Sequence, residues 1–233
     1  MTNTVIPRIA ALAPLLLAGC YQPVVEVDGG VPTEPLVVCG ERGRFDSPFT
    51  EALKDCQRVL GGVTFMGFQG EVVSAPNLAT VKVIDGALRF DRMPNATELA
   101  GFDTLEEVGE VSIHRAPQLR SLAGLQGLKR VHGFILGESV GVSALDQMSG
   151  LSRLSGRLGL NSTNVASLTA FSQTEELETL VLLNNRRLTS LAGLGALRMV
   201  TGDVEIRDNA IPKEEIDAFL ARVEVRGRVS RAP

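Results

Sequence analysis

Residues 119–133 are LRSLAGLQGLKRVHG, and residues 188–202 are LTSLAGLGALRMVTG, so the same spacing of Leu, Ser, Gly and Val occurs twice. Outward from these stretches, four parallel rows of mostly apolar residues keep one step of 23 residues over five turns: Leu99, Leu122, Leu145, Leu168 and Leu191; Phe102, Leu125, Met148, Phe171 and Leu194; Leu105, Leu128, Leu151, Thr174 and Leu197; Val108, Val131, Leu154, Leu177 and Val200. Four rows in register indicate a solenoid of stacked repeats.

Each turn also contains a short segment in which apolar and other residues alternate. Alternation with a period of two predicts a half-buried strand, with these residues pointing inward: Leu88 and Phe90, Val111 and Ile113, Leu158 and Leu160, Val181 and Leu183, Val204 and Ile206. Within one turn, the residues of the four rows lie three positions apart, as in Leu99, Phe102, Leu105 and Val108. This spacing favours a tight, partly 3₁₀ return. Stacked turns therefore predict a parallel sheet on one side and apolar ladders inside.

The third turn breaks this phase. A step of 23 from Val111 leads to Phe134, whereas a step of 23 back from Leu158 leads to Ile135. A slip of one residue reverses the side chains that face the core. Burial favours inward Phe134 and Leu136. The alignment of the glycines that precede the strands (Gly86, Gly109, Gly133, Gly156 and Gly202) favours inward Ile135 and Gly137, so both alternatives stay open.

The repeat, Gly-x-Val-x-Ile followed by Leu-x-Ser-Leu-x-Gly-Leu and a closing Val-x-Gly, stands here as residues 109–113, 119–125 and 131–133. It resembles the receptor L-domain type of leucine-rich repeat over about residues 60–229. The resemblance implies an α/β fold: a right-handed solenoid of about six turns of 23 residues, with a parallel sheet on one face and short helices capping both ends. One departure is that only Asn209 is assigned to the position of the usual asparagine ladder.

The N-terminus has an apolar run, Ile9 to Leu17, that ends in Leu17-Ala18-Gly19-Cys20. This ending resembles a bacterial lipobox, which predicts cleavage before Cys20 and lipidation of its thiol. We therefore divide the chain into a signal peptide (1–19), a flexible tether (20–36), an N-terminal cap (37–60) and the repeat solenoid with a C-terminal helical cap (61–233). The membrane is then a partner through the lipid, the location is the cell envelope, and Tyr21 favours the outer membrane.

Two other cysteines, Cys39 and Cys56, would enter an oxidising compartment after export, where a pair usually forms a disulfide. The alternative is two free buried thiols. Ser47 and Pro48 fit the start of a helix that would run to about Val59. At the other end, Pro212 fits a first helical turn, and a short strand is expected from Glu224 to Val229.

Composition and motifs argue against several functions. A formal charge of −4 without a Lys/Arg block provides no nucleic-acid footprint. Gly137-Glu138-Ser139-Val140-Gly141 matches a hydrolase nucleophile motif, but both histidines, His114 and His132, precede the serine and no histidine follows it. The two histidines are also too isolated for a metal site. We expect neither catalysis nor a cofactor.

The sequence therefore favours a membrane-anchored surface lipoprotein whose solenoid binds a protein or a glycan. The alternative is a structural envelope component without a discrete ligand. If Val181 and Leu183 point inward, then Leu180 and Leu182 point outward, and Phe134 and Leu136 join them in the glycine-aligned phase. An apolar centre with a charged rim is typical of an interaction site. The predicted binding residues are Leu180, Leu182, Phe134, Leu136, Arg157 and Glu205.

Overall fold

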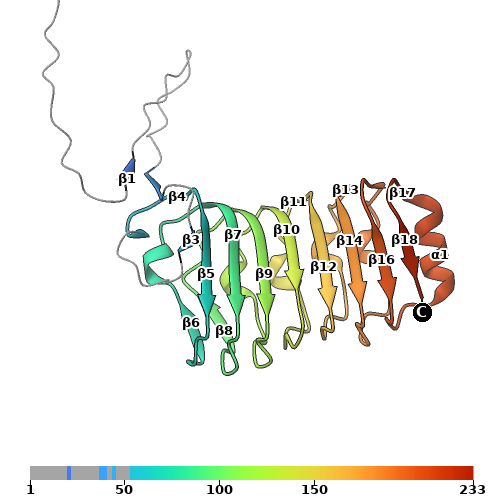
Figure 1. Ribbon diagram of the computed structural model, residues 1–233, viewed down its shortest axis with the longest axis horizontal. Helices are drawn as coiled ribbons and strands as arrows, with labels where there is room; N and C mark the ends of the chain where they lie inside the picture. Colours follow the sequence, from blue (N-terminus) through green and yellow to red (C-terminus); the bar gives the residue numbers. More distant parts are fainter. Residues whose placement is uncertain (1–19, 22–36, 41–43, 46–52, 233) are drawn as a thin grey trace, which may run out of the picture.

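The computed structural model describes residues 20–21, 37–40, 44–45 and 53–232. Within these residues the chain is a leucine-rich solenoid of the α/β class: successive coils stack so that each adds one strand to a long parallel sheet (Figure 1). Because no coil can bury its apolar side alone, the stability of each depends on its neighbours.

The principal sheet has 13 strands. Along its main path lie β1 (Cys20–Tyr21), β2 (Val38–Cys39), β4 (Arg58–Val59), β7 (Val83–Asp91), β9 (Glu107–His114), β10 (Arg130–Leu136), β12 (Arg157–Asn161), β14 (Thr179–Leu183), β16 (Val204–Arg207) and β18 (Val229–Arg231). Beside this path, β3 (Arg44–Phe45) pairs with β5 (Gly62–Met66), β5 also pairs with β7, and β11 (Arg153–Leu154) pairs with β10. The pairs are parallel except that of β1 with β2.

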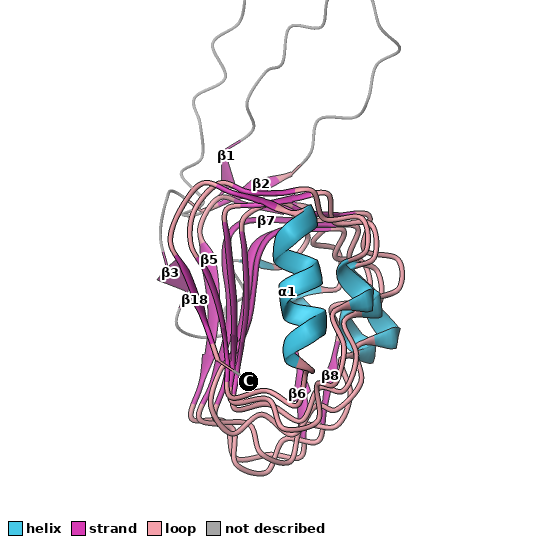
Figure 2. Cartoon of the chain, turned by 90° about the vertical axis from the view of Figure 1, so that its right-hand side faces the viewer, coloured by secondary structure: helices cyan, strands magenta, loops and turns pink. Residues whose placement is uncertain are grey.

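The opposite side of most coils returns through a short 3₁₀ helix, as the three-residue steps predicted, whereas the coil between β7 and β9 returns through strand β8 and a turn. Figure 2 shows these helices across the interior from the principal sheet. They are Pro76–Leu78, Ala123–Leu125, Asp146–Met148, Thr169–Phe171 and Ala192–Leu194. Small parallel sheets accompany them: β6 (Val72–Ser74) with β8 (Glu98–Ala100), and β13 (Glu176–Leu177), β15 (Met199–Val200) and β17 (Glu224–Val225). All four predicted rows are buried, including the polar exception Thr174.

The strands enter the principal sheet through corners of two different lengths. In the coils of β7, β12 and β16, three residues separate the last buried row from the next core-facing residue in the sheet, as between Leu154 and Leu158. Two residues suffice in the coils of β9, β10 and β14, as between Leu177 and Leu180. The buried rows of the return side therefore keep a constant spacing of 23 residues, whereas the core-facing residues of the sheet do not.

The two corner lengths determine which residues face the core in the third turn, at Phe134, and in the fifth, at Leu180. Phe134 and Leu136 lie opposite Leu158 and Leu160 and are fully buried, so the alternative that burial favoured is confirmed. Leu180 and Leu182 also lie opposite Leu158 and Leu160, and both are fully buried. The prediction that Val181 and Leu183 point inward is therefore wrong, because the preceding corner is one residue shorter than the one before Leu158.

The corrected phase reveals an asparagine that the sequence interpretation missed. Asn185, 0% exposed, accepts hydrogen bonds from the backbone nitrogen and hydroxyl of Thr163 at 3.0 and 2.7 Å. Its amide nitrogen donates to the Leu160 carbonyl at 3.1 Å and to Asn209 Oδ1 at 2.9 Å. Asn209 in turn donates to the Leu182 carbonyl. A two-step asparagine ladder therefore satisfies the backbone where the last strands end.

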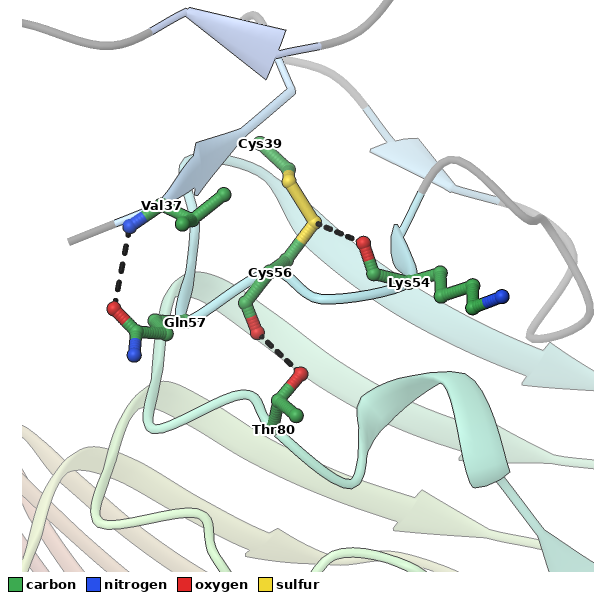
Figure 3. Close-up of a disulfide and its surroundings, with 6 residues drawn as sticks. All are labelled: Val37, Cys39, Lys54, Cys56, Gln57 and Thr80. Atoms are coloured by element: carbon green, nitrogen blue, oxygen red, sulfur yellow. Dashed lines mark hydrogen bonds between the residues drawn. A yellow bond between two sulfur atoms is a disulfide. The ribbon is translucent and has the colours of Figure 1, made fainter.

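The N-terminal end of the solenoid is closed by the predicted disulfide. Cys39 and Cys56 are bonded, their Cα atoms lie 5.8 Å apart, and both residues are buried (Figure 3). Thr80 of the next coil donates a hydrogen bond to the Cys56 carbonyl at 2.9 Å. The expected helix does not reach Val59, because Arg58–Val59 form strand β4; its proposed start at Ser47 lies outside the described residues.

The C-terminal end is covered by α1 (Lys213–Arg222), which buries Ile216 and Phe219 against the last coil, as predicted. The strand expected from Glu224 to Val229 is instead two strands, β17 and β18, because the chain turns at another corner around Gly227. None of the helices in the described part of the chain is long and apolar enough to cross a membrane.

Candidate interaction site on the outer face of the sheet

The outer face of the principal sheet presents the side chains that alternate with the core. Strand register aligns them in two neighbouring rows, which we call the Gly159 row and the Gly137 row. The Gly159 row consists of Arg89, Ser112, Ile135, Gly159, Val181 and Glu205. The Gly137 row consists of Asp91, His114, Gly137, Asn161, Leu183 and Arg207.

The centre of this face is a shallow recess of about 370 Å³ over strands β10, β12 and β14. Its apolar lining comes from Ile135, Val181 and Leu183, which are only partly buried. Gly159 lies between Ile135 and Val181, and the absence of a side chain there leaves the hollow. Gly159 itself is buried, and a Cβ atom there would meet the Arg157 and Ile135 side chains at 3.6–3.7 Å, in ordinary van der Waals contact and without a clash.

One end of the recess is formed by His114, whose imidazole lies across Gly137. A Cβ atom at Gly137 would overlap that ring, so the imidazole can occupy this position only because residue 137 is a glycine. The ring Nε2 lies 3.0 Å from the Ser112 hydroxyl. Burial of the ring lowers the pKa of His114 below its ordinary value, although the nearby Asp91 carboxylate opposes the shift. The lowered pKa favours the neutral imidazole at this end of the recess.

Beyond His114, Asp91 and Arg115 form a bidentate ion pair at 2.8 and 2.6 Å. The hydrogen bond with Asp91 is the main reason that the Arg115 pKa is raised, and the charge of Glu138 adds to it. At the other side of the recess, Glu205 is paired with Arg207. Both Arg115 and Glu205 therefore have their charges compensated by neighbours.

Arg157 differs from these charged neighbours. It is exposed at the start of β12 and has neither an ion pair nor a side-chain hydrogen bond among the described residues. Its Nε lies 3.6 Å from the position that a Cβ atom of Gly159 would occupy. The Arg157 side chain thus runs along the strand toward Gly159. Its positive charge, which has no ion-pair partner among the described residues, lies beside the apolar lining of the recess.

Two serines near this face are relevant to the catalytic motif and the histidines that the sequence suggested. Ser112, whose hydroxyl lies 3.0 Å from His114 Nε2, is only 2% exposed. Ser139, in the nucleophile-like motif, occupies the turn after β10 with a φ of 57°, whereas the hydrogen bond of the His114 ring is made with Ser112. Within the described ranges, no cluster of three or more His, Cys, Asp or Glu residues could hold a metal ion.

The predicted binding residues fall into two groups. Leu180, Leu182, Phe134 and Leu136 are each fully buried, so the predicted outward orientation of the first two is wrong and none of the four offers its side chain to a partner. Arg157 and Glu205 do line the recess. The apolar residues beside them are Ile135, Val181 and Leu183, one position away from the residues that were predicted. Cys20 belongs to β1, and its lipidation stays a prediction.

No protein-family model matches this sequence, and no curated protein matches it. Among solved structures, the chain is similar to the crystal structure of internalin C2 from Listeria monocytogenes, with 13% sequence identity and a TM-score of 0.38. The match covers 77% of this chain and 83% of that one. The fold described above therefore rests on the register, burial and hydrogen bonds of this chain itself.

Proposed function

We propose that this protein is a lipid-anchored module of the bacterial cell envelope that binds another protein through the outer face of its sheet. The observation that supports this function is the recess over Gly159, in which three aliphatic side chains remain partly exposed between charged neighbours. An apolar centre within a polar rim is the usual anatomy of a protein interface.

The composition of this face favours a protein over a glycan or a nucleic acid. Neither row contains Phe, Tyr or Trp, and the whole chain has no Trp and one Tyr. Aromatic platforms are the usual means of stacking on bases. Each row also carries one acidic and one basic residue, at opposite ends, unlike the basic stripe that phosphate backbones require. Aliphatic side chains beside a free arginine suit a protein surface instead.

The anchor is proposed from the sequence Leu17-Ala18-Gly19-Cys20 at the end of an apolar run. The disulfide between Cys39 and Cys56 agrees with export, because such bonds persist mainly in oxidising compartments. The backbone of β1 pairs with β2 at the N-terminal edge of the sheet. A lipid on Cys20 would therefore attach at this end of the solenoid, with the recess several coils away from it.

The binding function can be tested with a photo-activated cross-linking residue in place of Val181, expressed on intact bacterial cells. We expect a discrete cross-linked protein from this position. A matched variant places the same residue at Gln126, which is exposed on the opposite, 3₁₀ side of the coil. Equal cross-linking from both positions, or none from Val181, would contradict the proposed use of the sheet face.

The anchor has its own test. In a bacterial host fed labelled palmitate, the wild-type protein should incorporate the label and the Cys20→Ala variant should not. A Cys39→Ala/Cys56→Ala double variant controls for labelling of other cysteines and should keep the label if it reaches the envelope. Equal labelling of wild type and Cys20→Ala would rule out lipidation at this residue.

A further inference from the structure

The recess over Gly159 has features that select among protein partners. We propose that it binds an aliphatic side chain whose neighbouring carboxylate pairs with Arg157, so that the preferred partner is a protein segment with a Leu, Ile, Val or Met next to an acidic group. This inference rests on the proposed function and names the chemistry of its ligand.

The size and walls of the recess favour an aliphatic side chain. Its volume of about 370 Å³ is at the lower end of the roughly 300–1,000 Å³ that ligand pockets span. The floor is the backbone around Gly159, and the walls are the side chains of Ile135, Val181 and Leu183. A side chain that enters would remove these partly exposed apolar groups from water, which is the main source of favourable binding energy at such sites.

The charges around the recess indicate that the carboxylate of the partner binds at Arg157. Of the cations that line the recess, Arg115 is paired with Asp91, and burial disfavours a charge on His114, whereas Arg157 has no ion-pair partner in the described part of the chain. The two lining acids do not cancel it: Glu205 is paired with Arg207, and Glu138 acts on Arg115. A guanidinium binds a carboxylate through two parallel hydrogen bonds, which adds direction to the attraction.

The glycine at position 159 is what keeps the site open. In a sheet, a glycine weakens the strand and often marks a place where another group approaches closely. The surroundings of Gly159 within the chain impose no need for glycine, because a Cβ atom would meet neighbours only at 3.6–3.7 Å. By contrast, Gly137 must stay small to make room for His114. The packing of the sheet therefore does not require a glycine at position 159, and the missing side chain leaves the floor of the recess lower than its walls.

The inference is tested by selecting a phage-displayed library of random linear peptides on the full exported protein. We expect enriched peptides to share an aliphatic residue within two positions of Asp, Glu or the free C-terminus. Synthetic peptides of the enriched sequences are then measured on four variants. Gly159→Leu fills the hollow and Arg157→Gln removes the cation, and each should weaken binding by about tenfold or more.

Two matched variants serve as controls. Gly150→Leu adds the same side chain on the opposite side of the coil, where the nearest atoms to a Cβ are carbonyl oxygens at 3.7 and 3.8 Å. Arg153→Gln removes an exposed cation of β11 that does not line the recess. Both controls should bind within about twofold of wild type. Replacing the peptide carboxylate by an amide should cause the same loss as Arg157→Gln, and a C-terminal amide distinguishes a terminal from a side-chain carboxylate.

Three results would overturn the inference. Peptides that bind Gly159→Leu as well as wild type would place the binding site elsewhere, and enriched peptides without a carboxylate requirement would remove the role of Arg157. Failure to enrich any peptide would also count against it. None of these results affects cross-linking from Val181 on cells, so the proposed protein-binding function stands or falls separately.

Discussion

Strands β12 and β14 differ on their two faces, although both faces are largely aliphatic. On the inner face, Leu180 and Leu182 are fully buried and continue a ladder with Leu158 and Leu160. On the outer face, Val181 and Leu183 are partly exposed around a glycine. Four successive aliphatic residues thus divide into two that hold the fold together and two that are available to a partner. Residue type alone does not reveal which is which; the length of the preceding corner does.

The largest expected effect comes from a charge placed on either face of β14. Leu182→Asp puts an unpaired carboxylate into the core, which should destabilise the fold by several kcal/mol and can prevent folding. Leu183→Asp, one residue later, should cost less than about 1 kcal/mol because its side chain reaches solvent. Chemical denaturation of both purified variants measures the contrast. Similar losses would show that the two faces are not distinguished as described.

A second contrast compares asparagines on the two faces. Asn185→Ala removes the buried amide that connects three coils and leaves backbone groups of Leu160 and Thr163 without partners. Its expected cost is roughly 2–4 kcal/mol of unfolding free energy. Asn161→Ala, on the outer face, should change stability by about 0.5 kcal/mol or less. If urea denaturation finds the two variants equal, the ladder contributes no more than a surface amide.

A smaller effect concerns pH. Burial lowers the pKa of folded His114, so between that value and the ordinary one of about 6.5 the unfolded chain binds more protons than the folded chain. The contribution of this histidine to stability is therefore present above about pH 6.5 and is lost as pH falls toward the folded pKa. Thermal unfolding at pH 7.5 and 5.5 should show a smaller loss for His114→Gln than for wild type. His132→Gln, at an exposed corner, should retain the wild-type difference.

The smallest effect is expected at the outer-face glycines. Gly159→Ala should leave the free energy of unfolding within about 0.5 kcal/mol of wild type, since the added methyl meets only ordinary contacts. Gly137→Ala must displace the His114 ring and should cost more, roughly 1 kcal/mol. Calorimetric melting of the two variants is sufficient. A larger loss for Gly159→Ala would mean that this glycine is needed by the fold, and would weaken the argument that it keeps a binding site open.

Much of the fold follows from the sequence alone. The step of 23 residues predicts the solenoid because each row must stack on itself to be buried, and the three-residue spacing within a coil predicts the 3₁₀ return. The three cysteines and the apolar leader predict the disulfide between Cys39 and Cys56. The C-terminal helix follows from its proline, acids and apolar stripe. These features are local patterns or strict repetitions, so they do not depend on the register between neighbouring strands.

The site depends on what repetition does not determine. A corner of two residues in place of three shifts a strand by one position, and in a sheet one position exchanges the core for the solvent. The shorter corner before Leu180 places Leu180 and Leu182 opposite Leu158 and Leu160 of the neighbouring strand, a partner that the period of 23 residues does not reveal. The same slip concealed Asn185, although Leu-x-Leu-x-x-Asn stands in the sequence at residues 180–185. The sequence by itself determined the solenoid and its period. Only the tertiary structure decided that Ile135, Val181 and Leu183 line a recess over Gly159, because the face of a strand that is buried depends on its register with the neighbouring strands.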